Sequence, residues 1–231
     1  MELIERIDAM IEARHLLGHS FYRQWVAGSL PIEALREYAK QYYAFEANFP
    51  RFLSSLHARS DRPEVRQALL DNLWDEEHGE ANHAELWLRF AEGIGVDRDD
   101  VRGAVHNQRT RTLVDTYWEL CGEATVTAGI AAVYAYERQV PRVARAKIDG
   151  LKLRYGIEDR RTLEFFELHS SLDVEHSEAE RQMLSGASDE EAVVHATGAA
   201  LDAWWDFLDG VDPASTPLDS SAVSPAAARS G

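Results

Sequence analysis

Residues 165–177 read Phe-Phe-Glu-Leu-His-Ser-Ser-Leu-Asp-Val-Glu-His-Ser, and His169, Asp173 and His176 are spaced within them at i, i+4 and i+7. An α-helix turns by about 100° per residue, so these three side chains share one stripe of a helix. Burying two imidazoles and a carboxylate beside apolar residues costs free energy unless a partner compensates, and a bound cation would be such a partner. The stretch therefore predicts a helix that carries metal ligands, against the simpler reading of an exposed helix face or a core histidine.

Helical periodicity of apolar residues extends through most of the chain, and no alternating run typical of a strand stands out. The pattern predicts seven or eight helices in one all-α domain over residues 1–211. A shift to proline, serine and alanine predicts a disordered tail over 212–231. The principal helices are expected at 3–17, 19–26, 29–49, 64–91, 112–120, 123–155, 159–184 and from about 188 to 208.

The composition limits the partners of the protein. Forty acidic against 24 basic residues give a formal charge of −16, which argues against nucleic acid or an anionic membrane surface as a partner. No apolar run approaches the roughly 20 residues that cross a bilayer, and the first residues lack the pattern of a secretory signal. Cys121 is the only cysteine, so no intrachain disulfide can form. We therefore expect a cytoplasmic protein.

A second cluster lies in Trp74-Asp-Glu-Glu-His-Gly-Glu-Ala-Asn-His, on the helix predicted at 64–91. Glu76 lies seven residues before His83 and Glu80 lies three before it, so either pair shares one face of that helix. The spacing alone leaves both choices open. The other charged side chains of this segment are expected to be solvated: Asp75, Glu77 and His78.

The third candidate is Glu137, which ends an uncharged run over residues 124–136. A carboxylate in such an apolar stretch either meets Arg138 or a hydroxyl group, or binds a cation. On its own, the salt bridge is at least as good an explanation as a metal.

Together the three segments offer three imidazoles and three carboxylates, which suits two cations better than one. A single structural zinc ion usually takes four ligands and favours cysteine. Mixed imidazole and carboxylate ligands with open positions suit iron or manganese that reacts with O₂. The predicted ligands are Glu76, His83, Glu137, His169, Asp173 and His176.

With these six residues, the chain resembles the haem-oxygenase-like di-metal oxidase superfamily, whose motif is a Glu and a His with six residues between them, a lone Glu, and His-x-x-x-Asp/Glu-x-x-His. The resemblance favours Glu76 over Glu80. It covers residues 3–185 and is strongest to the group named for the Chlamydia protein associating with death domains, also labelled pyrroloquinoline-quinone-synthase-like. It implies a haem-oxygenase-like helical bundle, a homodimer, and an Fe/Fe or Fe/Mn pair that uses O₂ and an external reductant.

Members of that group are reported to make p-aminobenzoate from one of their own tyrosines, with a lysine as amino donor. The matching residues are Tyr22, with Tyr38 as a second aromatic, and Lys147. Tyr136 is a further candidate as an electron relay. From the sequence alone we would expect these tyrosines to be ordinary core residues. Lys147 follows Glu137 by ten residues, about 15 Å along one helix, so the sequence alone predicts a solvated lysine.

Four alternatives compete with this function. The same scaffold could oxidise an external fatty acid or amino acid with the same ligands. A cofactor-free quinone synthase would leave the ligand set unexplained, as would a protein that only binds death domains. A thiaminase-like hydrolase needs a cysteine within about residues 131–136, whereas Cys121 lies sixteen residues before Glu137 and is expected to be a buried small residue.

Overall fold

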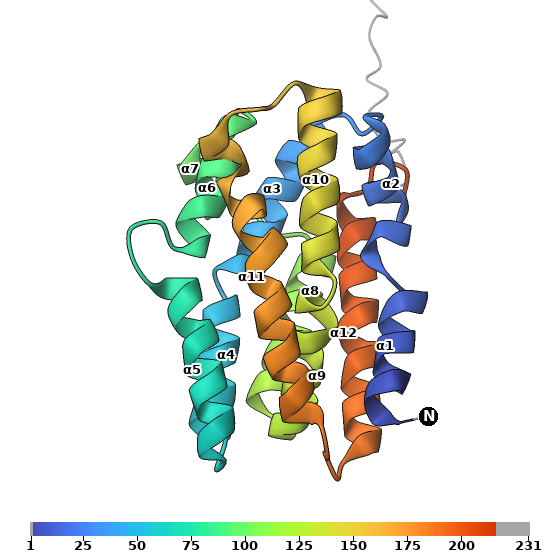
Figure 1. Ribbon diagram of the computed structural model, residues 1–231. Coiled ribbons are helices and arrows are strands. Elements are labelled where there is room, and N and C mark those ends of the chain that lie inside the picture. The colour runs from blue at the N-terminus through green and yellow to red at the C-terminus, as the bar shows by residue number, and fades with distance from the viewer. Residues whose placement is uncertain (1, 216–231) are drawn as a thin grey trace, which may run out of the picture.

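The computed structural model describes residues 2–215, and it is helical throughout, with no strand in that part of the chain (Figure 1). The all-α fold class is confirmed. The elements are α1 (Leu3–Ala13), a 3₁₀ turn (Leu16–Gly18), α2 (Ser20–Ala27), α3 (Ile32–Glu46), α4 (Phe49–Arg59), α5 (Pro63–Glu77), α6 (His83–Gly93), α7 (Arg98–Arg102), α8 (Gln108–Gly122), α9 (Val126–Glu137), α10 (Val140–Tyr155), α11 (Arg160–Leu184) and α12 (Glu190–Val211).

Helix α9 lies at the centre of the packing, against α12, α11, α8 and α4. It carries no charge before Glu137, and every residue from Ala128 to Glu137 is buried. Gly129 permits this close approach, because a Cβ at that position would lie 2.4 Å from Leu56 Cδ2 on α4 and 2.9 Å from the Leu120 carbonyl oxygen on α8. The sequence places Glu137 at the end of a helix that has no solvent-facing side.

Three long helices predicted from the sequence are each broken in two, so the expected seven or eight helices were too few. The helix expected at 64–91 is interrupted at 78–82, where Gly79 has a φ of +85°, a conformation that favours glycine. Figure 1 shows this loop bulging on the left side between α5 and α6.

The other two breaks precede a proline. Pro50 and Pro141 each stand in the first turn of a new helix, where the missing N–H is harmless, rather than at a kink within a longer one. The predicted helix at 29–49 thus becomes α3 and the start of α4, and the one at 123–155 becomes α9 and α10.

The last described residues continue the packed domain beyond the expected boundary at 211. Asp212 is fully buried, and its carboxylate accepts hydrogen bonds from Ser20 Oγ, from Gln24 Nε2 at 3.0 Å and from the Ala214 N–H at 2.9 Å. The rest of the predicted tail, 216–231, lies outside the described residues.

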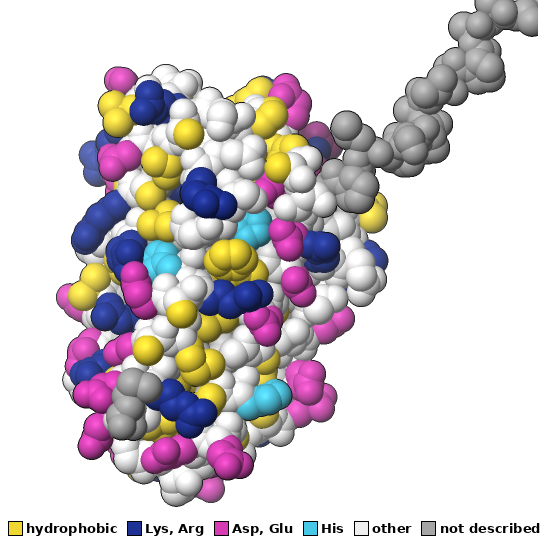
Figure 2. All heavy atoms as spheres, turned by 90° about the vertical axis from the view of Figure 1, so that its right-hand side faces the viewer, with side chains coloured by type: hydrophobic (Ala, Val, Ile, Leu, Met, Phe, Trp, Pro, Cys, Tyr) yellow, Lys and Arg dark blue, Asp and Glu magenta, His cyan; other side chains and the backbone are white. Residues whose placement is uncertain are grey.

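Charges on the surface are mixed in sign where α1, α2 and α12 form one face. Figure 2 shows acidic and basic side chains interspersed there, and ion pairs join neighbouring helices, such as Arg14–Asp202 at 2.9 Å and Arg142–Glu12 at 2.7 Å. Among the described helices, none combines the length and the apolar character needed to cross a membrane.

Candidate metal centre

The structure gathers the six predicted ligands into two groups of three buried side chains. In the first group, one ligand atom each from Glu76, His83 and His169 lies within 4.8 Å of the others. His83 Nδ1 is 2.7 Å from Glu76 Oε2, and the His83 and His169 rings are 4.5 Å apart. Glu80 is exposed in the loop before α6, so the geometry selects Glu76.

The second group consists of Glu137, Asp173 and His176, with ligand atoms again within 4.8 Å of one another. His176 Nδ1 lies 3.8 Å from Asp173 Oδ1 and 4.0 Å from Glu137 Oε1. Helix α11 contributes to both groups, because His169, Asp173 and His176 share the predicted stripe and all three are buried. Each group could hold one cation.

The pairing of Glu76 with His83 was predicted for the wrong reason. The two residues do not share a helix: Glu76 stands in the last turn of α5, and His83 begins α6. The side chain of Asn82 accepts a hydrogen bond from the Glu85 N–H at 3.0 Å and so starts α6 at this point. The loop over 78–82, rather than a helical repeat, brings the carboxylate and the imidazole together.

Hydrogen bonds orient two of the imidazoles toward the groups. His169 Nδ1 donates to the Phe165 carbonyl oxygen at 2.7 Å, which leaves Nε2 as the ligand atom. His176 Nε2 donates to Asp75 Oδ2 at 3.1 Å, which leaves Nδ1 facing Asp173 and Glu137. Asp75 was expected to be merely solvated. Although exposed, it fixes the orientation of His176, as carboxylates commonly do for metal-binding histidines.

The charge balance of the groups fits a bound cation. Burial raises the pKa of Glu137 and raises that of Asp173 well above its ordinary value. Within the described residues, Glu137 Oε2, Asp173 Oδ2, His83 Nε2 and His176 Nδ1 are buried without a hydrogen-bond partner. Unpartnered buried carboxylates are costly, and iron or manganese accepts this mixture of oxygen and nitrogen ligands. The donor set therefore suits a pair of such ions.

In the first group, a proton competes with a cation. Burial lowers the pKa of His83, but the neighbouring Glu76 outweighs it and the pKa rises to about 9. A metal ion must displace that proton, so loading releases it. Burial lowers the pKa of His169 well below its ordinary value, which keeps this imidazole neutral and ready to bind a cation.

An aromatic cavity adjoins the first group. It is lined by His169 together with Tyr22, Tyr42, Tyr136 and Lys147, among others. The hydroxyl groups of Tyr22 and Tyr38 are 3.1 Å apart, and Lys147 Nζ donates to Tyr38 Oη at 2.8 Å.

The expectation of a solvated Lys147 was wrong, since only 5% of this residue is exposed. The break after Glu137 puts it on α10, which packs against α2 and α11 instead of continuing α9. Burial lowers the pKa of Lys147 to about 7.

The family model for iron-containing redox enzymes matches residues 36–205. The chain belongs to this family. This redox enzyme is 40% identical to the 4-aminobenzoate synthase of Nitrosomonas europaea, over 90% of this chain and 89% of the relative. It is 38% identical to the 4-aminobenzoate synthase of Chlamydia pneumoniae, over 89% of this chain and 92% of the relative. A TenA homologue from Pseudomonas syringae has a TM-score of 0.78 at 15% identity over 90% of each chain, which confirms the fold class.

Two buried carboxylates of this redox enzyme were missed by the sequence reasoning. Glu46 is the one acidic residue in the run Tyr42-Tyr-Ala-Phe-Glu-Ala, and burial together with nearby Glu76 raises its pKa to about 8. Glu180 continues the stripe of His169, Asp173 and His176 by one further turn. That spacing was a readable signal for Glu180. The burial of Glu46 depends on how α3 packs and could not be read from one helix.

Proposed function

We propose that this enzyme makes 4-aminobenzoate from the side chain of its own Tyr22, with Lys147 as the source of the amino nitrogen. The proposal is supported by the names of the two relatives, each matched over about nine-tenths of its length. The observation that carries it is the position of Lys147 Nζ, which is buried 2.8 Å from Tyr38 Oη and 5.3 Å from the ring of Tyr22.

In this proposal, Glu76, His83 and His169 hold one metal ion, and Glu137, Asp173 and His176 hold the other, as an Fe/Fe or Fe/Mn pair. When bound, the metal pair supplies oxidising power from O₂ and an external reductant. His169 belongs to the first group and lines the aromatic cavity. This arrangement supports oxidation of a side chain inside the protein, because the ligand side chain and Tyr22 face the same enclosed space.

Burial prepares Lys147 as an amine. Six aromatic rings lie with their centroids 5.1–5.8 Å from Nζ, and few polar groups are present to stabilise an ammonium ion. Burial lowers the pKa of Lys147 to about 7, so a large share of the side chain carries a free lone pair at neutral pH. Tyr38 holds the amine through its hydroxyl and also contacts the hydroxyl of Tyr22.

The atoms of the product define the bonds that change. The ring and Cβ of Tyr22 become the ring and carboxyl carbon of 4-aminobenzoate, so the Cα–Cβ bond breaks and Cβ is oxidised from a methylene group to a carboxylate. The phenol oxygen leaves as water when the carbon–nitrogen bond forms, and the Nζ–Cε bond of Lys147 then breaks, with Cε oxidised to an aldehyde. O₂ and the reductant balance the electrons. Each chain reacts once.

Isotope labelling tests this mechanism directly. Protein carrying ring-¹³C tyrosine and ε-¹⁵N lysine is loaded with Fe(II), with or without Mn(II), and exposed to reductant and O₂. We expect 4-aminobenzoate labelled at both positions, together with peptides that have lost mass at residues 22 and 147. Tyr22→Phe should give no product, whereas the control Tyr43→Phe, at a residue outside this cavity, should react normally.

An unchanged Tyr22 peptide in a reacted, metal-loaded sample would defeat the self-consuming mechanism. A product without ¹⁵N would show that Lys147 is not the nitrogen source, and it would leave the role of Tyr22 intact. Oxidation of an added fatty acid or amino acid with an intact residue 22 would instead identify an oxidase that acts on an external substrate.

A further inference from the structure

A cavity of about 220 Å³ opens between α5 and α11 beside the second group of ligands. Exposed carboxylates stand at its outside, from Asp71, Asp75 and Glu175. Buried polar residues line its inside, where the cavity meets the predicted ligands. These inner residues are Asn72, His176 and Glu180.

Glu180 is the unexplained residue of this cavity. Only 2% of it is exposed, and neither carboxylate oxygen has a hydrogen-bond donor among the described residues. Its carboxyl group meets that of Glu137 at the inner end of the cavity. Two buried carboxylates in contact repel each other unless a proton or a cation lies between them, and a cation that reaches this point displaces the proton.

The neighbouring Asn72 joins the cavity to the second group of ligands. Its side-chain nitrogen donates to Glu137 Oε1 at 3.0 Å, and its Oδ1 is buried without a partner among the described residues. Oxygen atoms from Asn72 and Glu180 therefore stand between the exposed acids and the second group. A divalent cation that loses its water on the way inward would meet oxygen ligands at each step.

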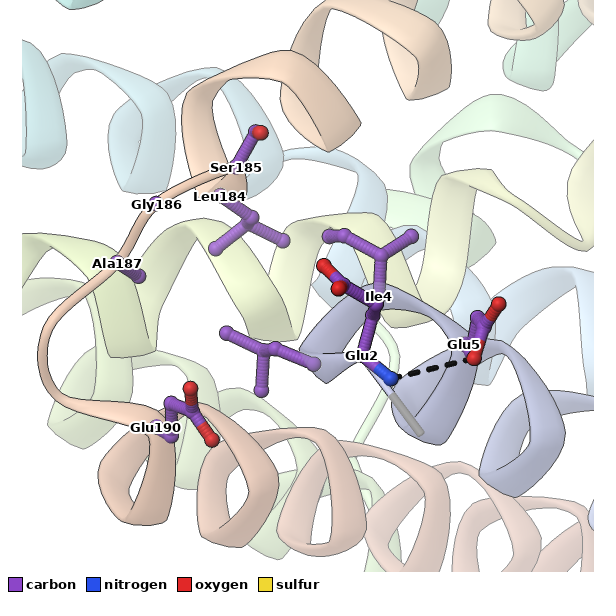
Figure 3. A pocket seen from close by; sticks show the side chains of 9 residues that line it. Glu2, Ile4, Glu5, Leu184, Ser185, Gly186, Ala187 and Glu190 are labelled. Carbon is purple, nitrogen blue, oxygen red and sulfur yellow. Dashed lines mark hydrogen bonds between the residues drawn. The ribbon is translucent and has the colours of Figure 1, made fainter.

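Another acid-lined cavity of this protein lacks these properties. It measures about 470 Å³ and lies between the start of α1 and residues 184–190 (Figure 3). Its acidic residues, Glu2, Glu5 and Glu190, are all exposed, and Glu5 Oε2 accepts a hydrogen bond from the Glu2 N–H at 3.2 Å. Exposed acids are stable in water without an ion, so this cavity indicates no ligand.

We propose that the cavity between α5 and α11 is the entry port for divalent cations, and that Glu180 passes each cation to Glu137. The outer carboxylates attract the ion, and Glu180 replaces lost water before Glu137, Asp173 and His176 bind it. Glu180 follows His176 by one helical turn, so the stripe on α11 extends from the port into the centre. This inference rests on the second group being a metal site, as in the proposed function.

The rate of metal uptake tests the port. Apo-protein is mixed anaerobically with Co(II) chloride, and the visible absorbance of bound cobalt is followed by stopped flow. Glu180→Gln should slow the phase that fills the second group by about tenfold, the low end of what charge-lined clefts add to association rates. Glu178→Gln removes the same charge two residues away, on a side chain that does not line the cavity, and should match the wild type.

A second measurement separates transit from permanent ligation and from folding. After long incubation, Glu180→Gln should contain as much cobalt as the wild type, and apo Glu180→Gln should melt no lower than apo wild type. Asp71→Asn should slow uptake less than Glu180→Gln, and its effect should fade in 0.5 M salt because Asp71 is exposed.

The proposed port would be wrong if Glu180→Gln took up cobalt as fast as the wild type. It would also be wrong if this variant bound one cobalt ion fewer per chain after long incubation. If Glu178→Gln slowed cobalt uptake as much as Glu180→Gln, the slowing would be due to net charge alone, and the proposed port would be wrong. Failure of the wild type to bind cobalt would defeat the metal centre itself and the port with it, whereas normal uptake without 4-aminobenzoate would defeat only the proposed reaction.

Discussion

The Nζ atom of Lys147 lies 2.8 Å from the hydroxyl oxygen of Tyr38, although 109 residues separate them in the chain. This contact joins α10 to α3 inside the aromatic core. A lysine is rarely buried this deeply without a carboxylate partner. The protein therefore carries a destabilising amine in its interior, which is typical of a residue kept for chemistry rather than for folding.

Removing this amine should stabilise the metal-free protein. Burial lowers the pKa of Lys147 from 10.5 to about 7, so between these values the unfolded chain binds a proton that the folded chain does not. The penalty on folding is complete below pH 7 and disappears as the pH rises through 10.5. Lys147→Met should therefore raise the free energy of unfolding at pH 7 by roughly 3–5 kcal/mol, and by much less near pH 10.

Urea unfolding of the apo-protein at both pH values measures this difference. Lys152→Met is the matched control, because Lys152 lies on the same helix with 40% of its side chain exposed. A Lys147→Met variant less stable than the wild type at pH 7 would show that the amine is well accommodated and that its pKa is not lowered.

Some features of the fold depend on local sequence pattern, and others depend on tertiary packing. Apolar periodicity predicted the helices, and the stripe of His169, Asp173 and His176 follows from the helical repeat alone. The breaks at Gly79 and before Pro141 were missed because a glycine or proline can also lie within a long helix. Lys147 is buried only because the second break redirects α10, so its position depends on tertiary packing that no local pattern contains.

The first ligand group should lose its metal ion when His169 is removed. His169→Ala removes one of three side chains of the first group, which leaves Glu76 and His83 with too few ligands to retain an ion. We expect about one metal ion fewer per chain by elemental analysis after gel filtration. His195→Ala, which changes an exposed histidine on α12, should leave the metal content unchanged. Full metal content in His169→Ala would show that the first group is not a metal site.

Asp75 should act on the affinity of the second group although it binds no ion itself. Its carboxylate accepts a hydrogen bond from His176 Nε2 at 3.1 Å, which fixes the ring and increases the basicity of the imidazole. Asp75→Asn weakens this interaction. Loss of such a partner typically lowers metal affinity by about 10- to 100-fold. A competition titration with a chelator measures this change for Mn(II). Glu77→Gln, at an exposed residue two positions away, should bind like the wild type.

Gly129 should control the packing of α9 and, through it, the second group. A methyl group at this position would lie 2.4 Å from Leu56 Cδ2 and 2.9 Å from the carbonyl oxygen of Leu120, and a backbone atom cannot move aside as a flexible side chain can. Gly129→Ala should therefore cost roughly 1–3 kcal/mol of stability. It should also weaken metal binding, because α9 ends in Glu137.

Gly198→Ala on α12 is the matched control for Gly129→Ala. A Cβ there would meet only Met10 Cε, at an ordinary 3.6 Å, so the gain in helix propensity should stabilise the protein by roughly 0.5–1 kcal/mol. Thermal unfolding of both variants should show shifts of opposite sign. If Gly129→Ala left the melting temperature unchanged, α4 and α8 would be able to move away from α9. The tight packing around Glu137 would then not be what positions this carboxylate.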